Sequence, residues 1–509
     1  MDTTPNPRRW WALGALALGV LVLGLDTTVL NVALPSMATG LGADNSDLQW
    51  IVDGYTVVFA AGLVPAGLLG DRFGRKKLIL VGLALFGGAS LLGALAGSVP
   101  TVVAARALMG VGAALVMPLS MSILPSVFPA EERGRAVGVW AAATAVGLPL
   151  GPILGGVLLE HFWWGSVFLF NIPVVAVALV ACALWTPESR DPRAKPIDVP
   201  VSVLLAGGLG VLVYGTIEAS QRGWLDPVVL GLIGAGLAVI AAVVVRETRH
   251  RAPMIDFTLF GNRNFLWGSI AAVVPSFVMT GVLFVVPQRL ASVDGQGALG
   301  TGVRLLPLMG GLLVASLTAD KLVVRLGHRA VLPAGLALLG AGVLLGATGS
   351  ASDGYGSTAL WLTVTGLGLG LSLVPAMGAV LATLAPERAG VGSGLMQTLR
   401  QVAGALGVAV LGSVLAAAYT DRLDATGPAE DSVAGAVEVA RRTGDAGLLA
   451  DARDAFVHGM DLVLLTCGLL SIAAAVVIAL FLPGRRPAAE EAAAPAATPG
   501  AETAKVSAG

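Results

Sequence analysis

The sequence predicts an all-α integral membrane protein whose chain crosses the bilayer fourteen times. Hydrophobic residues make up 56% of the 509 positions and charged residues only 12%, against about 25% charged in an ordinary soluble domain. A single soluble core stops growing near ~250–300 residues. An apolar excess of this size therefore indicates side chains that face lipid, and the lipid bilayer is the first partner that the composition predicts.

Each crossing of the hydrocarbon core needs about 20 mostly apolar residues. An apolar stretch near the N-terminus follows Arg8 and Arg9, as in a secretion signal, but it is longer than the ~7–15 residues typical of one, so we expect a retained first span. Fourteen stretches satisfy the length requirement, at about 10–34, 48–69, 78–97, 101–125, 136–159, 164–185, 199–218, 227–246, 265–288, 302–320, 330–349, 358–382, 393–418 and 459–482.

Lysine and arginine predict how these spans are oriented. Most of the 31 basic residues fall on alternate connections, on the side that both chain ends share. Because basic connections stay on the cytoplasmic side, we expect both termini to be cytoplasmic and the protein to lie in the inner (cytoplasmic) membrane of a bacterial cell. Segment 1–9 would then be a short cytoplasmic N-terminus, and the Ala-, Pro- and Glu-rich tail 483–509 a disordered cytoplasmic segment.

Two short sequence matches indicate an internal repeat. Residues 73–76 (FGRK) match residues 326–329 (LGHR), and the Glu-Arg pair at 132–133 matches the pair at 387–388 at nearly the same offset. Both matches relate spans 2–5 to spans 10–13. Duplicated halves around a central site are typical of secondary transporters.

The repeat predicts the domain organisation. We expect two six-helix halves, 10–185 and 265–482, with two inserted central helices in 199–246. Within the second half, the segment 419–457 mixes acids, arginines and alanines at helical spacing. It is expected to form a helical hairpin outside the membrane.

The connection between spans 2 and 3 reads GDRFGRKK (70–77). This sequence resembles the most recognisable signature of the major facilitator superfamily. Glycines let this connection turn tightly beside neighbouring helices, and its acid and arginines can form a charge lock that breaks when the two halves move. A basic loop that only sets topology is the alternative, but it would not need the acid or the paired glycines. The residues expected to form the gating lock are Gly70, Asp71, Arg72, Gly74 and Arg75.

Span 1 contains an aspartate, Asp26, in the sequence LDTTVLNVALP (25–35). An aspartate inside a span costs ~2.5–3.5 kcal/mol on insertion scales, so it should face a cavity or a partner. Such a carboxylate can bind either a proton or a cation, which makes Asp26 the candidate proton carrier. A structural acid satisfied by Thr27 and Thr28 is the alternative.

Two further ionisable residues are candidates for proton coupling. Asp53 lies near the outer end of span 2, where it either lines the pathway with Asp26 or is solvated at the membrane surface. Arg106 in span 4 stays charged, so its role would be to bias a nearby carboxylate, with snorkelling toward water as the alternative. The sequence around Arg106 resembles a span-4 motif of the superfamily that is implicated in proton transfer.

Span 5 carries glycines at every fourth position, which form a smooth stripe that a neighbouring helix can approach closely. Prolines within the stripe are expected to bend the helix. The segment resembles a motif typical of antiporters rather than of uptake symporters, and a pure packing stripe is a compatible alternative. The residues expected to form this helix packing are Gly147, Pro149, Gly151, Pro152, Gly155 and Gly156.

Taken together, these motifs resemble the fourteen-span drug:proton antiporters of the major facilitator superfamily. The resemblance implies the major facilitator fold, exchange of protons for small lipophilic substrates, and export by alternating access. Acids in spans 1 and 2 favour cationic substrates. Asn31 in span 1 and Arg400 in span 13 are candidate contacts for the substrate or an ion, although Arg400 could also snorkel to the cytoplasm.

Other classes of function find little support in the sequence. The net charge of −1 gives no basic field for nucleic acid, and neither a nucleotide loop nor a catalytic set of residues indicates an ATP-driven pump or an enzyme. Isolated Cys182 and Cys467 indicate no disulfide framework or metal site, and no cofactor is expected. A dedicated exporter of one endogenous metabolite or self-made antibiotic remains open, and a non-transporting receptor is disfavoured by the intact motifs.

Overall fold

The computed structural model describes residues 8–43, 45–190, 198–250, 257–349, 354–384, 389–423 and 433–482. In these ranges the chain is helical and contains no strand. Its longer helices are α1 (Arg9–Leu41), α2 (Asn45–Phe73), α3 (Arg75–Ala94), α4 (Val99–Ser122), α6 (Ala130–His161), α8 (Asn171–Trp185), α9 (Val199–Arg222), α10 (Pro227–Arg249), α11 (Arg263–Gln288), α13 (Leu306–Leu326), α14 (His328–Gly346), α15 (Tyr355–Thr383), α16 (Ala389–Arg422) and α19 (Ala446–Phe481).

These helices correspond one by one to the fourteen predicted spans. Among the described residues, thirteen helical stretches are long and apolar enough to cross a membrane. The remaining long helix, α6, has 32 residues and an apolar stretch at Leu150–His161. Short helices complete the described chain, namely α5 (Leu124–Val127), α7 (Ser166–Leu169), α12 (Ala298–Arg304), α18 (Val433–Thr443) and the single turns η1 (Phe257–Gly261) and η2 (Arg289–Val293).

Several helices begin where an aspartate or asparagine supplies the missing hydrogen-bond acceptor. Asp226 accepts from Val228 N at 2.8 Å at the start of α10, and Asn262 accepts from Asn264 N at 2.9 Å at the start of α11. Such capping satisfies backbone donors that no helical carbonyl can reach. These polar residues therefore mark where the apolar helices begin.

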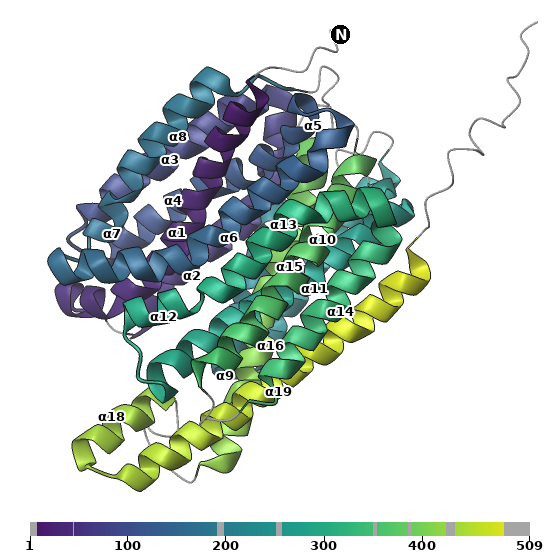
Figure 1. Cartoon of the computed structure of the whole chain (residues 1–509). Helices are drawn as coiled ribbons and strands as arrows, with labels where there is room; N and C mark the ends of the chain where they lie inside the picture. The colour runs from purple at the N-terminus through teal and green to yellow at the C-terminus, as the bar shows by residue number, and fades with distance from the viewer. Residues whose placement is uncertain are drawn as a thin grey trace, which may run out of the picture.

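The helices form two bundles that lie side by side (Figure 1). In the first bundle α1 packs on α6 and α8, and α4 packs on α2 and α3; in the second, α15 packs on α13 and α14, and α19 on α14 and α16. Between them, α9 contacts α2 of the first bundle and α16 of the second, while α10 packs on α9. The two inserted helices therefore cover one seam between the halves.

The structure supports the internal repeat at its turns. Gly74 and Gly327, which match in the sequence repeat, both adopt positive φ angles, of 108° and 79°. Each directly precedes a helix, α3 or α14. Only glycine enters this conformation without a steric cost, so both halves use the same residue for the same turn. The second half of the other match, 387–388, lies outside the described residues.

The bundle of helices has two ends, which carry different elements. The α2–α3 face is the end at which α2 meets α3, near Gly70–Lys77, and the α18 face is the end that carries α18 (Figure 1). Residues 1–7 and the tail 483–509, for which a cytoplasmic location was predicted, lie outside the described residues.

The described parts of the segment 419–457 are mainly helical, and the last of them is continuous with the final span. Helix α18 forms one arm, and the other arm is the beginning of α19, which runs without a break for 36 residues into the last span. Asp445 caps α19 by accepting from Gly447 N and Leu448 N, both at 3.0 Å. No proline interrupts the helix after that point, so nothing separates the arm from the span. Residues 424–432 lie outside the described chain.

Candidate transport site

A buried ion pair joins two helices of the first bundle. Arg106 Nη1 on α4 donates to Asp26 Oδ2 on α1 at 2.5 Å. Asp26 is 4% exposed and Arg106 is 1% exposed. The arginine therefore does not snorkel to water, and its charge is compensated inside the bundle by the carboxylate that the sequence singled out.

Two more helices complete this network. Asn171 on α8 donates its Nδ2 to the second carboxylate oxygen of Asp26 at 2.8 Å and contacts Ser90 Oγ on α3 at 3.2 Å. Sequence reasoning missed Asn171, although a polar residue within the apolar stretch 164–185 is a signal that could have identified it. Three helices of the first half, α1, α4 and α8, thus meet at one carboxylate, and α3 joins the network through Asn171.

Helix α2 holds the guanidinium of Arg106 from another side. Arg106 Nε donates to the backbone oxygen of Ile51 at 3.1 Å, and its carbon Cζ lies 4.2 Å from the centre of the Tyr55 ring, a cation–π contact. Asp53, between these two residues in sequence, is also buried, with 8% exposure. This burial argues against a carboxylate solvated at the membrane surface.

The glycine stripe of α6 packs directly on the part of α1 that carries Asp26. A Cβ atom added at Gly147 would lie 2.8 Å from Leu25 N, and one added at Gly151 would overlap the side chain of Thr28. At Gly155 it would lie 3.3 Å from Val32. Close backbone contact between α1 and α6 therefore depends on these glycines.

The remaining residues of this motif lie within the same helix. Pro149, Pro152 and Gly156 are part of α6, which continues from Ala130 to His161 through both prolines. The side chain of Pro149, like that of Asn31 on α1, lies outside the described part of the structure.

On the α2–α3 face, Asp71 and Arg75 form a second buried ion pair. Arg75 donates through Nη2 and Nε to Asp71 Oδ1 at 2.7 and 2.9 Å, and its side chain is fully buried. Arg75 also donates to the backbone oxygen of Ser122 on α4 and to Ser189 Oγ, which follows α8. One arginine therefore ties the α2–α3 turn to two other helices.

The other residues of the predicted lock have different surroundings. Arg72 is exposed and lies over the ring of Phe73, 5.5 Å from its centre. A Cβ atom at Gly70 would collide with the side chain of Leu119 on α4. Glu188, which sequence reasoning missed, accepts from the backbone N of Lys76 at 3.1 Å at the start of α3, where a carboxylate is favoured by the helix dipole.

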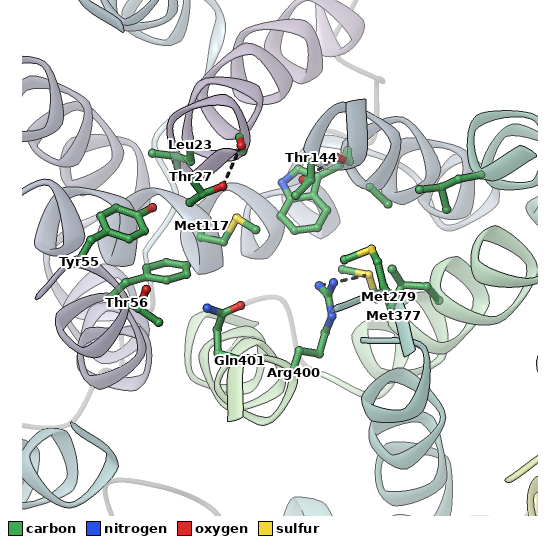
Figure 2. Close-up of a pocket in the computed structure, with 16 residues that line it drawn as sticks. Leu23, Thr27, Tyr55, Thr56, Met117, Thr144, Met279, Met377, Arg400 and Gln401 are labelled. Carbon is green, nitrogen blue, oxygen red and sulfur yellow. Dashed lines mark hydrogen bonds between the residues drawn. The ribbon is translucent and has the colours of Figure 1, made fainter. Parts of the chain in front are cut away.

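A cavity of about 200 Å³ lies between the two bundles, and Figure 2 shows its lining side chains. Helices α1, α2, α4 and α6 line it from the first half, and α11, α13, α15 and α16 from the second. The lining residues are Leu23, Gly24, Thr27, Tyr55, Thr56, Phe59, Met117, Trp140, Ala141, Thr144, Met279, Leu312, Leu373, Met377, Arg400 and Gln401.

Arg400 is the charged group of this cavity wall. It donates to Ser276 Oγ at 3.0 Å and to Gln397 Oε1 at 2.8 Å, and it points toward Met377 in Figure 2. Its position in the wall does not fit a side chain that snorkels to the membrane surface. Among the lining residues that the structure describes there is no carboxylate, because Asp26 and Asp53 lie outside the wall.

The two halves meet closely on the α2–α3 face. A Cβ atom at Gly134 of α6 would overlap the carboxylate of Asp320 on α13, and one at Gly138 would lie 3.3 Å from the backbone carbon of Ser316. Helix α6 thus packs on α1 within its own half and on α13 of the other half. It links the ion-pair network to the interface between the halves.

In the described part of the chain, no group of three or more histidines, cysteines and carboxylates could hold a metal ion. Cys182 and Cys467 are both buried free thiols. Among the described residues, the site offers two buried ion pairs, an arginine in the cavity wall that forms no ion pair, and neutral hydrogen-bonding groups.

In the described residues, fourteen long helices form two similar halves with a largely apolar cavity between them that holds one arginine, and this arrangement defines a multi-pass membrane transporter. The chain belongs to the major facilitator superfamily, whose family model matches residues 16–408. This membership confirms the family and fold predicted from the motifs, and it makes the protein a transporter rather than an enzyme.

Similar proteins match nearly the whole chain. The tetracenomycin C resistance and export protein of Streptomyces glaucescens is 35% identical over 97% of this chain and 96% of its own length. The multidrug efflux pump LfrA of Mycolicibacterium smegmatis is 34% identical over 94% of this chain and 97% of its own. Among solved structures, the human organic anion transporter MFSD10 shares the fold with a TM-score of 0.62 at 17% identity, and the match covers 92% of this chain and all of that one.

Proposed function

We propose that this protein is a proton-coupled antiporter that exports small lipophilic drugs or antibiotics across the cytoplasmic membrane. The observation that carries the proposal is the buried Asp26–Arg106 pair beside the glycine stripe of α6. The functions of similar proteins, drug efflux and antibiotic export, support the direction of transport. Both termini and the α2–α3 face would be cytoplasmic, as the basic connections predict.

Proton coupling in this proposal rests on competition for one carboxylate. A proton that reaches Asp26 neutralises it, so the carboxylate can no longer hold Arg106, and the network with Asn171 must rearrange. Asp53, buried on the neighbouring helix, is the second candidate for the same proton. Because α6 contacts both α1 and α13, a change at Asp26 can reach the interface between the halves.

The conformational cycle would move the halves 10–185 and 265–482 against each other. In the conformation described here, contacts between α6 and α13, such as that of Gly134 with Asp320, hold the two halves together on the α2–α3 face. Alternating access requires that these contacts open when the cavity faces the cytoplasm. One proton moving through the membrane field provides ~2.3 kcal/mol per 100 mV, enough for a roughly fifty-fold gradient of a neutral substrate.

A dedicated exporter of one self-made antibiotic is the second candidate. Its support is the similarity to the tetracenomycin C resistance and export protein. The fold and the ion-pair network would be the same, and the difference would lie in how many compounds the cavity accepts. A panel of chemically unrelated substrates therefore separates the two candidates.

Purified protein in liposomes with a trapped pH indicator tests the proposal. We expect substrate addition to cause a proton flux in the wild type, and Asp26→Asn to abolish the flux while leaving substrate binding intact. Asp451→Asn, which changes an exposed aspartate on α19, is the matched control and should behave as the wild type. An Asp26→Asn variant that still couples protons would reject Asp26 as the carrier and direct the test to Asp53.

A further inference from the structure

The two intramembrane arginines differ in how their charges are compensated. Arg106 pairs with Asp26 behind the cavity wall, and neither residue lines the cavity. Arg400 lines the cavity, and its described partners, Ser276 and Gln397, are both neutral. Within the described residues Arg400 forms no ion pair, although its guanidinium stays protonated at any physiological pH.

A guanidinium in this position gives the cavity a positive charge. Removing an ion from water is expensive, and hydrogen bonds to neutral groups return only part of the cost. Compensation must then come from what enters the cavity, which is water in the empty state and a ligand group in the loaded state. A cationic ligand would meet like charge there, whereas an anionic group would complete the ion pair that the protein leaves open.

The rest of the wall suits a flat aromatic ligand. Trp140 and Tyr55 contribute aromatic surface, and Met117, Met279 and Met377 contribute polarizable thioethers that pack favourably against rings and adapt to different shapes. Trp140 is held in place by its own hydrogen bond, from Nε1 to Ser120 Oγ at 2.9 Å. The lining therefore combines one cationic anchor with an adaptable apolar surface.

We propose that the cavity is a binding site for aromatic organic anions, in which Arg400 pairs with a carboxylate or an ionised phenol of the substrate. The proposal rests on the proposed transport function and names its substrate class. It differs from the expectation of cationic substrates, which depended on Asp26 and Asp53. The structure places neither acid in the cavity wall, and Asp26 is already paired with Arg106.

The charge of the substrate also decides how the membrane potential acts on exchange. When one proton enters for each monovalent anion that leaves, two charges move in the direction that an inside-negative potential favours. One-for-one exchange of a proton for a monovalent cation moves no net charge. An anion exporter should therefore respond to a potential alone, without a pH gradient.

Two dyes with the same xanthene core, anionic fluorescein and cationic rhodamine 123, test the binding site. In fluorescence anisotropy titrations of the purified protein, we expect tighter binding of fluorescein. Arg400→Gln should weaken fluorescein binding at least tenfold and leave rhodamine 123 binding unchanged or improved, while Arg400→Lys should retain part of the fluorescein affinity. Arg222→Gln makes the same chemical change at a half-exposed pair on α9, outside the cavity wall, and should bind both dyes as the wild type does.

The possible failures are distinguishable. Preference for rhodamine 123 in the wild type, or equal loss of both dyes in a folded Arg400→Gln, would overturn the anion site. Proton-coupled export of rhodamine 123 with no response to fluorescein would overturn the anion site and leave the proposed antiport intact. Fluorescein binding that depends on Arg400, with no transport in liposomes under either a pH gradient or a valinomycin-imposed potassium potential, would support the site and refute the transport function.

Discussion

The two halves of the molecule use buried arginine in opposite ways. In the first half, Arg106 is neutralised by Asp26 and held by α2, and Asn171 of α8 donates to the same carboxylate. In the second half, Arg400 is held by neutral groups at the edge of a cavity. A buried arginine can therefore serve either the protein's own switching network or a site that a ligand completes. The residue or group that pairs with the arginine distinguishes these two roles.

The largest expected effect comes from breaking the pair in the first half. Arg106→Ala leaves the Asp26 carboxylate buried without its cation, so we expect the free energy of unfolding to fall by about 3–5 kcal/mol. Thermal unfolding of the purified protein measures this loss. The double variant Asp26→Asn/Arg106→Gln removes both charges and should recover much of the stability while remaining uncoupled; a double variant no more stable than Arg106→Ala would contradict the pairing.

Closing the space between α1 and α6 should have the next largest effect. Gly147→Ala places a Cβ atom 2.8 Å from Leu25 N, so the helices must separate, with an expected loss of about 1–3 kcal/mol and of most proton-coupled transport. Gly14→Ala on the same α1 helix meets no atom within 4 Å and is the control. It should be neutral or stabilise the protein by about 0.5–1 kcal/mol through better helix propensity. Equal effects of the two changes would disprove a special role for the stripe.

Asn171 offers a finer test of the network. Asn171→Ala removes the donor to Asp26, and hydrogen bonds to charged groups contribute about 1.5–3 kcal/mol. If the hydrogen bond from Asn171 stabilises the network while Asp26 exchanges its proton, its loss should lower the coupled transport rate roughly ten- to hundred-fold. Dye binding should change little. Parallel measurements of proton flux and dye affinity separate this positioning role from general damage, which would reduce both.

The smallest effect is expected at the surface pair of Arg9 and Glu132, whose side chains lie 2.7 Å apart. Hydrogen bonding from Arg9 holds the pKa of the Glu132 carboxyl below its usual value of 4.5. A lowered pKa in the folded state stabilises the protein above pH 4.5, and this contribution is lost as the pH falls toward the folded-state pKa. Glu132→Gln should therefore lower the melting temperature slightly at pH 7, and the difference should vanish in acid. A difference in melting temperature between Glu132→Gln and the wild type that grows below pH 4.5 would contradict this prediction.

Hydropathy and spacing predicted the parts of the structure that depend on local sequence. The spans follow from the length of apolar stretches, and Asp26 and Arg106 were identifiable because a charge within a span is expensive. The match of residues 73–76 with 326–329 predicted an internal repeat, and Gly74 and Gly327 share a positive φ at that turn. Each of these inferences needs only one residue or one window of the chain.

The features that the sequence did not predict all depend on which residues meet in space. Asn171 is a neutral residue in an apolar span, and its role appears only when α8 lies beside Asp26. Glu188 lies in the connection that follows α8, and its role appears only when that connection lies beside the start of α3. For Arg400 the residue was identified, but its environment was not, because the neutral Ser276 is more than a hundred positions away in the chain.

The position of α9 determines where lipid can touch the seam between the halves. This helix contacts both α2 and α16, and its Trp224 Nε1 donates to Ser413 Oγ of α16 at 3.1 Å. The α6–α13 seam on the other side of the bundle adjoins exposed apolar side chains of α13, among them Val314 and Leu317. Lipid therefore reaches α13 beside the α6–α13 seam, whereas α9 stands between lipid and the contact of α2 with α16.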